Sequence, residues 1–398
     1  MWVVDGNSSP WLRPQRGVYV FSSQPTIIYP TPSTTAITTT SGHSETYLCA
    51  FGATGSGYFD LGTTTSYGLI HEFTPITTPG TAWLVCDNWG PPALTPEALY
   101  HWRFTFTASE GATFYGVDQT FRTLPDGRVT TGTGTPASCT EAAFNVALAA
   151  AGTKEIVFDC GLTPVTITMT ASRSITTGLT INGGNRVTLQ RQNDGAGNHF
   201  NVQAGAQLTL TQITLSNAVN TSTCGGTVQV LAGGILTLSE ARFVNNRSNA
   251  QGGAVCNWGT TNATAAVFTD NVSVSSHGGA IGSYGSLTLT NSLFVNNRSA
   301  VNGGGIDMGG TTTVTSSSFT GNAAGYRGGG INTYGGTLNV TESSFTRNTA
   351  GLYGGGLAND ASNGAVTGST FSGSSSSGPG GGVELGGPQE GSRSPTPR

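Results

Sequence analysis

Apolar and polar positions recur with a period of 25 to 26 residues over the stretch 236–385. Each repeat carries a phenylalanine, an asparagine three positions later, a glycine block and then an aliphatic residue; only Ser374 breaks the asparagine column. These columns consist of Phe243, Phe268, Phe294, Phe319, Phe345 and Phe371, and of Asn246, Asn271, Asn297, Asn322 and Asn348. Residue types that share one period predict a solenoid in which each repeat forms one coil.

Within each repeat, polarity also alternates with the period of a β-strand. Leu236 and Leu238, like Leu287 and Leu289, lie two positions apart, so both side chains of each pair share one face of a strand. A coil of about 25 residues holds three short strands and three turns, and such coils stack about 4.8 Å apart. We therefore predict a parallel β-helix of roughly nine coils over 156–385, with an axis on the order of 40 Å.

The repeated residues have separate expected roles in this coil. The phenylalanines fill the interior, where each buried ring contributes roughly 1.5–3 kcal/mol. The asparagines hydrogen-bond along the axis and to their own turn. The glycines suit a turn that needs a positive φ or a close approach of two backbones.

The segment 140–151 is predicted to form a helix. Ser138 or Thr140 can cap it, and Gly152 ends it. Its apolar residues need cover, so we expect the helix to lie across the open end of the first coil and shield the core. No comparable helix follows Val383 and Leu385, which leads us to expect that the natural chain continues beyond this point.

The first part of the chain follows another pattern. Residues 24–125 are rich in β-branched and aromatic residues, and Gly or Pro turns recur every 8 to 12 residues, as in a β-sandwich. Strands are expected at 36–40, 45–51, 57–61, 82–87, 99–107 and 119–123. We thus predict an extension (1–23), a β-sandwich (24–125), a linker (126–137), a capped β-helix (138–387) and a flexible tail (388–398).

Composition narrows the range of partners. The chain has 60 glycines, 9% charged residues and a net charge of −4, which excludes a helical protein and leaves no basic face for nucleic acid. No apolar run reaches 18 residues, so no transmembrane segment is predicted. The start of the chain lacks the apolar core of a signal peptide, and we expect an incomplete reading frame or a misplaced start. No cofactor is expected.

Six cysteines form no C-x-x-C pair, which makes a zinc site improbable. In an exported protein the pairs Cys49–Cys86 and Cys139–Cys160 are the candidate disulfides, and buried free thiols are the alternative. Cys224 and Cys256 stand at different points of the repeat, so we expect them not to pair.

The charges of the solenoid can be tested for an active site by their place in the repeat. Glu240 and Glu342 share a column four coils apart, and Asp307 and Glu384 share another three coils apart. No acidic pair falls in adjacent coils of one column. The gap from each Phe to the next glycine block is always 9 or 10 residues, so no long insertion builds a substrate wall. We therefore predict no catalytic or metal-binding residue.

Other chemically interesting residues are expected to be structural. The irregular stretch 190–199, with Asp194 and His199, is the one candidate functional loop, and a plain turn is preferred there. His277 beside a glycine block is assigned a turn or stacking role. Packing or surface roles are expected for His43, His71, His101, Trp83 and Trp89.

Two stretches of the first part resemble a known domain. Residues 57–68 read GYFDLGTTTSYG, which resembles the Y-x-F-E-Y-G-T-T-x-x-Y-G segment of bacterial fibronectin type III-like domains. Residues 94–125, with YHWR at 100–103 and DQTFRT at 118–123, resemble the end of the same domain. The resemblance covers about 100 residues, and it implies a spacer or binding module on a secreted protein.

The second part resembles another group. The order of Cys139, a helix and strands at 156–158, 165–168 and 179–181 resembles the opening of bacterial extracellular right-handed β-helix proteins. The pairs GGAV at 252–255 with FVNN at 243–246, and GGAI at 278–281 with FVNN at 294–297, resemble repeats of polymorphic outer membrane proteins. This implies an extracellular or cell-surface right-handed β-helix, without the membrane barrel of that family.

These observations predict a non-catalytic secreted or cell-surface protein with an adhesive or structural role. It would bind a glycan or protein through a long face rich in Ser, Thr and Asn. One alternative is a polysaccharide-active enzyme, lyase or glycoside hydrolase, with its site near 190–235. Another is a passive surface spacer.

Overall fold

The computed structural model describes residues 26–28, 42–49, 54–72, 83–89, 94–95, 98–123, 127–150, 152–192, 197–221, 224–360 and 363–386. The chain divides between Asp126 and Gly127 into two compact units, unit 1 before this point and unit 2 after it. Among the described residues, no helix has the length and apolar character needed to cross a membrane.

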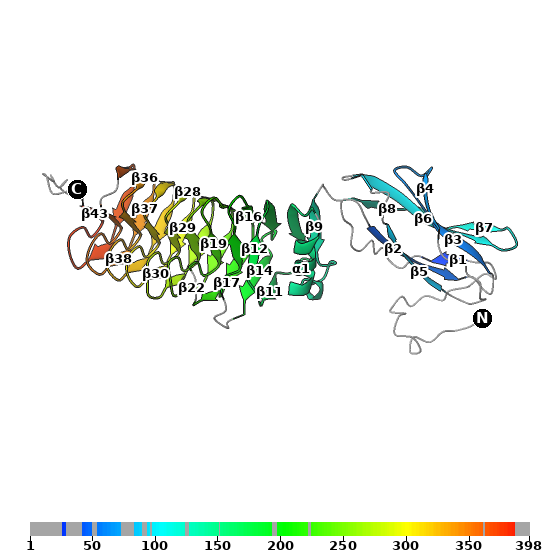
Figure 1. Cartoon of the computed structure of the whole chain (residues 1–398), viewed down its shortest axis with the longest axis horizontal. Coiled ribbons are helices and arrows are strands. Elements are labelled where there is room, and N and C mark those ends of the chain that lie inside the picture. Colours follow the sequence, from blue (N-terminus) through cyan, green and yellow to red (C-terminus); the bar gives the residue numbers. More distant parts are fainter. Residues whose placement is uncertain are drawn as a thin grey trace. The chain divides into compact units, whose positions relative to one another are not determined.

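Unit 1 consists of antiparallel strands in two sheets (Figure 1). One sheet has the order β1-β2-β5, with β1 (Thr26–Ile28), β2 (Gly42–Cys49) and β5 (Trp83–Trp89). The other has the order β4-β3-β6-β7, and β8 also pairs with β6. Its strands are β3 (Gly55–Gly62), β4 (Leu69–Glu72), β6 (Leu99–Ala108), β7 (Thr113–Tyr115) and β8 (Gln119–Arg122).

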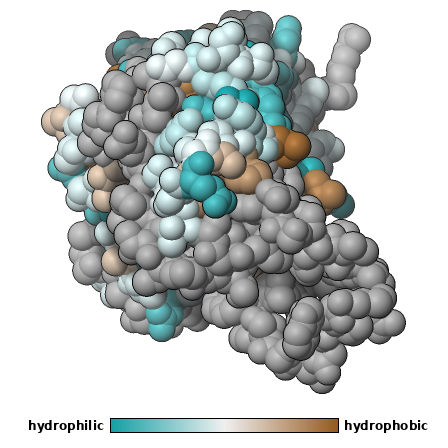
Figure 2. All heavy atoms as spheres, turned by 90° about the vertical axis from the view of Figure 1, so that its right-hand side faces the viewer, coloured by the Kyte–Doolittle hydropathy of each residue, from teal (hydrophilic) through white to brown (hydrophobic). Residues whose placement is uncertain are grey.

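The core of this second sheet is aromatic. Phe59 and Phe104 are fully buried, and their rings meet edge to face at 5.0 Å. The backbone N–H of Thr95 donates to the Tyr100 hydroxyl at 2.9 Å, which fixes the corner before β6. On the face in Figure 2 the coloured surface is mostly pale or teal, with a few brown spots, as expected where apolar side chains point inward.

Predicted strands at 45–51, 57–61, 82–87, 99–107 and 119–123 correspond to β2, β3, β5, β6 and β8. The expected strand at 36–40 lies outside the described residues. The two antiparallel sheets agree in class with a β-sandwich, whereas membership of the fibronectin type III-like domains stays a prediction.

Unit 2 opens with the predicted cap. Helix α1 (Glu141–Ala149) follows the short turn η1 (Pro136–Ser138). Of the two candidate caps, Thr140 is the one that serves, because its hydroxyl accepts from the N–H of Ala143 at 3.1 Å. Phe144 is fully buried in the same core as the first coils. The prediction of a β-helix with an N-terminal capping helix is confirmed.

The rest of unit 2 is a right-handed parallel β-helix whose coils contribute to four sheets (Figure 1). The first sheet has ten strands: β9 (Arg128–Thr131), β10 (Glu155–Phe158), β13 (Leu179–Asn182), β16 (Gln207–Thr211), β20 (Ile235–Ser239), β24 (Thr260–Thr264), β28 (Ser286–Thr290), β32 (Thr311–Thr315), β36 (Thr337–Thr341) and β40 (Asn363–Thr367). The segment 126–137, which we predicted as a linker, contains β9, which pairs in parallel with β10.

The second and third sheets have nine strands each. The second comprises β11 (Val165–Met169), β14 (Val187–Arg191), β17 (Thr214–Ser216), β21 (Arg242–Val244), β25 (Val267–Thr269), β29 (Leu293–Val295), β33 (Ser318–Thr320), β37 (Ser344–Thr346) and β41 (Thr370–Ser372). The third comprises β12 (Arg173–Ile175), β15 (Phe200–Val202), β19 (Val228–Val230), β23 (Val255–Asn257), β27 (Ile281–Ser283), β31 (Ile306–Met308), β35 (Ile331–Tyr334), β39 (Leu357–Asp360) and β43 (Val383–Gly386).

A fourth sheet, which the sequence did not predict, lies between the second and the third along each coil. Its seven strands of two residues are β18 (Val219–Asn220), β22 (Arg247–Ser248), β26 (Val272–Ser273), β30 (Arg298–Ser299), β34 (Ala323–Ala324), β38 (Thr349–Ala350) and β42 (Ser375–Ser376). A regular coil therefore has four strands and not three.

The phenylalanine column forms a continuous stack in the core. From Phe243 to Phe371, neighbouring rings lie parallel with centroids 4.6–4.8 Å apart. Because each ring faces its equivalent in the next coil, the column fills the interior and fixes the coil register at once.

The asparagine column is fully buried and satisfied. The Oδ1 of Asn297 accepts from the backbone N–H of Asn271 at 3.0 Å, and its Nδ2 donates to the carbonyl of Phe268 at 2.9 Å. The same contacts repeat along the ladder, and at its end the Ser374 hydroxyl accepts from the N–H of Asn348 at 3.2 Å. A buried amide that bonds two coils ties them together and caps a turn at the same time.

Candidate functional site

The outward side chains of the third sheet form a column that is buried although it points away from the core. In each three-residue strand the first and third residues face inward and the middle one faces outward. Yet Cys256, Asp307, Asn332 and Ala358 are at most 4% exposed. We call these outward positions the covered column; its members from β19 to β43 are Gln229, Cys256, Gly282, Asp307, Asn332, Ala358 and Glu384.

The covered column is shielded from solvent by the turn that leads into each glycine block. We call this turn the covering turn. A Cβ at Gly252 (φ 68°) would lie 2.0 Å from the carbonyl of Val255, so only glycine lets this turn fold back onto the strand. Each covering turn also reaches the next coil, since a Cβ at Gly282 would lie 3.1 Å from Cβ of Gln251. Residues about 30 positions apart therefore meet across coils.

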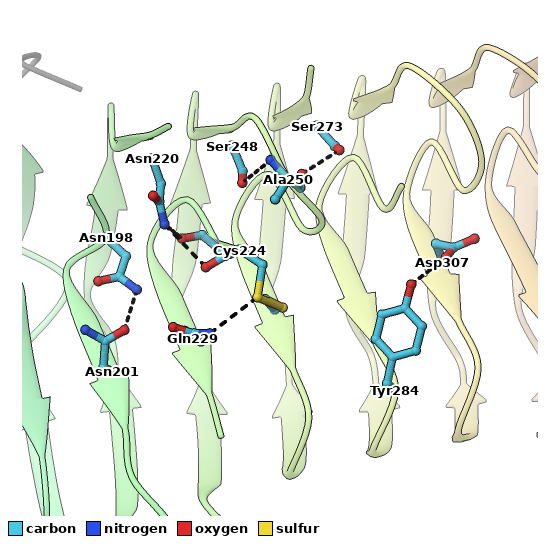
Figure 3. Close-up of a disulfide and its surroundings, with 12 residues drawn as sticks. Asn198, Asn201, Asn220, Cys224, Gln229, Ser248, Ala250, Ser273, Tyr284 and Asp307 are labelled. Atoms are coloured by element: carbon cyan, nitrogen blue, oxygen red, sulfur yellow. Dashed lines mark hydrogen bonds between the residues drawn. A yellow bond between two sulfur atoms is a disulfide. The ribbon is translucent and has the colours of Figure 1, made fainter. Parts of the chain in front are cut away.

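The disulfide Cys224–Cys256 forms because each covering turn reaches the covered column of the next coil. Cys224 lies in the covering turn of one coil and Cys256 in the covered column of the next, with Cα atoms 5.6 Å apart. Our expectation that they would not pair was wrong, because different points of the repeat are the ones that meet. Figure 3 shows this disulfide, with Gln229 Nε2 donating to Cys224 Sγ at 3.6 Å.

The other cysteines fall into two groups. Cys139 and Cys160, a predicted pair, form a disulfide with Cα atoms 5.6 Å apart. Cys49 and Cys86 belong to β2 and β5, whose side chains lie outside the described part of the chain, so this pairing stays a prediction.

Asp307 is the buried acid in the middle of the covered column. Asn332 Nδ2 donates to its Oδ1 at 2.7 Å, and the Tyr284 hydroxyl lies 3.5 Å from Oδ2, as Figure 3 shows for Tyr284. Burial raises the pKa of the Asp307 carboxyl, while Asn332, the charge of His277 and Tyr284 oppose this shift. Burial and the Asp307 charge raise the pKa of Tyr284 to about 12, so this hydroxyl stays protonated.

Further along the column, two carboxylates and one guanidinium come together. Arg327, in a covering turn, places Nη1 2.5 Å from Oδ2 of Asp360 at the end of β39. Glu384 stands opposite Ala358, two residues before Asp360, on the same face. Two residues along one strand and one strand across correspond to about 8 Å between the Cα atoms of Glu384 and Asp360.

The electrostatics of this cluster single out Glu384. Burial raises the pKa of its carboxyl; the Arg327 charge opposes that shift and the Asp360 charge adds to it. Within the described residues, neither Oε2 of Glu384 nor Nε of Arg327, both buried, has a hydrogen-bond partner. The Arg327 guanidinium also lies 4.7 Å from the ring centroid of Tyr353, which holds it in place. A buried polar atom without a protein partner calls for an explanation, and a catalytic role is one of them.

This cluster corrects the column test made on the sequence. The strand register keeps Asp307 and Glu384 three coils apart, as expected. Asp360 and Glu384, however, occupy different columns of neighbouring coils and still share one face. The signal that could have found them is the strand period of two, which places Ala358 and Asp360 on the same side.

The histidine, tryptophan and aspartate residues singled out in the sequence have the following contacts. His199 is fully buried, and its Nε2 lies 3.0 Å from the carbonyl of Leu189; burial and the Arg191 charge lower its pKa to about 3. Asp194 lies outside the described residues. The Nδ1 of His101 lies 2.7 Å from Oδ2 of Asp118. His43, His71, Trp83 and Trp89 belong to strands whose side chains are not described.

No set of three or more His, Cys, Asp or Glu side chains in the described ranges is arranged to hold a metal ion.

Comparison with known proteins gives two distant structural neighbours. No family model and no curated protein matches the chain. Among solved structures, it is similar to the family 28 exopolygalacturonase of Yersinia enterocolitica, with 7% identity, a TM-score of 0.25 and coverage of 91% of this chain and 98% of that chain. It is also similar to the pectate lyase PelI from Erwinia chrysanthemi, with 12% identity, a TM-score of 0.17 and coverage of 85% of each chain.

Both neighbours are named as enzymes. Our prediction of a non-catalytic adhesive or structural protein assumed that the charges of the solenoid are dispersed, and this premise fails at Arg327, Asp360 and Glu384. That prediction is wrong, and we do not retain it. At such identities the likeness concerns the fold, so an activity has to be argued from the site itself.

Proposed function

We propose that the protein is an extracellular polysaccharide-active enzyme that hydrolyses glycosidic bonds with Glu384 and Asp360. The observation that carries this proposal is a half-buried Glu384 with a raised pKa and an Oε2 that has no described hydrogen-bond partner, on the same face as Asp360. Glycoside hydrolysis generally uses two carboxyl groups whose environments differ, one as acid and one as base or nucleophile.

The two carboxyl groups receive separate roles in this proposal. Glu384 donates its proton to the glycosidic oxygen, because a raised pKa keeps that proton available nearer neutral pH. Asp360 then removes a proton from the attacking water.

Arg327 is assigned a positioning role. Its Nη1 lies 2.5 Å from Oδ2 of Asp360 and holds that carboxylate in place. A fixed cation beside the two carboxylates also favours an acidic sugar, because its charge attracts a substrate carboxylate.

The proposed location outside the cell rests on the two disulfides of unit 2, since such bonds persist in oxidising compartments. For unit 1 we propose the spacer or binding role that the fibronectin type III-like resemblance implies. A polysaccharide is the proposed partner of unit 2.

The test is cleavage of a panel of soluble polysaccharides, including polygalacturonate and xylan, followed by reducing ends and by the ultraviolet absorbance of unsaturated products. A hydrolase releases reducing ends without that absorbance, whereas a lyase produces both. We expect Glu384→Gln and Asp360→Asn each to lower kcat by roughly 10²–10⁴-fold.

Matched controls are available on other faces of the coils. Glu342→Gln and Asp270→Asn make the same chemical changes at exposed turn positions and should retain full activity. Equal activity of Glu384→Gln and the wild type would contradict the proposal, as would absence of cleavage across the panel.

A further inference from the structure

An exposed aromatic column runs beside the covered column and ends at Asp360. The residues that follow Asn257, Ser283, Met308, Thr333 and Asn359 occupy equivalent positions in successive coils of the third sheet. They are Trp258, Tyr284, Gly309, Tyr334 and Asp360, and the register pairs Tyr334 directly with Asp360. One aromatic rung is thus missing, at Gly309.

The rings on either side of Gly309 differ in their contacts. Trp258 and Tyr284 stack with centroids 4.5 Å apart, and Tyr284 is anchored near Asp307. Tyr334 is 75% exposed, and no described aromatic ring stacks on it. Such an exposed ring is left without the packing that the other members of a ladder receive.

The missing rung has the size of one ring. Tyr284 and Tyr334 are two coils apart, or roughly 10 Å at the strand spacing. The stacked phenylalanines of this protein show that one ring per coil fits at 4.6–4.8 Å. A ring at the level of Gly309 would therefore contact Tyr284 on one side and Tyr334 on the other.

Glycine backbone forms the surface next to this gap. Gly285 and Gly310 follow Tyr284 and Gly309, and a Cβ at Gly310 would lie 2.0 Å from the carbonyl of Gly285. Neither Gly285 nor Gly310 therefore places a side chain beside the gap. A Cβ at Gly309 would lie 3.2 Å from Cδ1 of Tyr284, so the Tyr284 ring directly borders the gap.

We infer that the gap above Gly309, between Tyr284 and Tyr334, binds one sugar ring of the polysaccharide substrate. The inference rests on the proposed function, which supplies the ligand class. A pyranose has an apolar face of C–H groups, which stacks on an aromatic ring, and a rim of hydroxyls, which stays in water. Tyr334 lies one coil from Asp360, so a chain held here extends to the two carboxylates.

The test measures binding of polygalacturonate and of xylan fragments by isothermal titration calorimetry, in the Glu384→Gln background so that no cleavage occurs. We expect Tyr334→Ala to weaken binding about tenfold, as for loss of an aromatic anchor. Gly309→Tyr, which completes the aromatic column, should weaken it at least as much. Tyr115→Ala removes an exposed tyrosine of unit 1 and should leave the affinity unchanged.

A melting curve for Gly309→Tyr shows whether this variant keeps the fold. If it does not, the affinity of Tyr334→Ala alone decides the test. Binding that is unchanged in both variants would overturn the sugar site and leave the proposed hydrolysis standing. Failure of the Glu384→Gln protein to bind either polysaccharide would also overturn the sugar site. The proposed hydrolysis is tested separately, by cleavage of the polysaccharides by the wild-type protein.

Discussion

The phenylalanine and asparagine ladders and the covered column belong to the same coils, yet they differ in one respect. Inside, the same residue recurs in every coil, as in the stack from Phe243 to Phe371. Outside, the covered column changes at each step, from Cys256 to Gly282 to Asp307. A shared backbone therefore supports both, and the positions that leave the repeat are the ones that carry distinct chemistry.

The largest stability effect is expected inside. Phe294→Ala removes a fully buried ring with two stacked neighbours and should lower the free energy of unfolding by about 3–5 kcal/mol. Leu293→Ala, at a residue 36% exposed in the same strand, is the control. Chemical denaturation of both variants measures the difference, and equal losses would mean that the ladder does not dominate stability.

The disulfide of the covered column comes second. Replacing Cys224 and Cys256 by serine should lower the free energy of unfolding by about 3 kcal/mol, because the bond closes a loop in the unfolded chain. The loss should be seen by denaturation under oxidising conditions and should disappear when a reductant is present. If the double variant and the wild type melt alike without reductant, the covering turn is held by other contacts.

The asparagine ladder ranks third. Asn297→Ala leaves the N–H of Asn271 and the carbonyl of Phe268 buried without their side-chain partner, which should cost about 2 kcal/mol or more. Asn339→Ala, on the exposed face of β36, makes the same change without such contacts. Hydrogen exchange at Asn271 should accelerate in the first variant alone; protection of that amide in both would contradict the ladder's role.

The smallest predicted effect is an increase in stability, at Asp307. Because burial raises the pKa of Asp307, the native state holds its proton at pH values where the unfolded chain has lost it, and stability falls as the pH rises above the ordinary value of 3.8. Asp307→Asn removes this fall and keeps an acceptor for Asn332. We expect a more stable protein at neutral pH and no change near pH 3. A destabilised variant at neutral pH would show that the charge of Asp307 is favourable.

The fold was largely predictable because its signals are periodic. Phe and Asn recur at one interval, and Thr140 stands at the start of an apolar helix. The fourth sheet escaped prediction because strands of two residues, such as Arg247–Ser248, are too short to show an alternation.

The candidate site was predictable only in part. Sorting charges by column placed Asp307 and Glu384 correctly, but it assumed that functional partners share a column. Cys224 and Cys256 meet because a covering turn lies over the next coil, and Arg327 reaches Asp360 in the same way. This offset is set by how the glycine turn folds back, which the repeat period does not specify.

The reach of each covering turn into the next coil has a consequence for how such a chain can change. Deleting or duplicating one complete coil would leave the phenylalanine and asparagine ladders in register, since their members are equivalent. The same event between His277 and Asp307 would give each a new neighbour, because the charge of His277 acts on a carboxyl group in a different coil. The core therefore tolerates the loss or gain of a complete coil. The contacts between the covering turns and the covered column do not, because they join residues that differ from coil to coil.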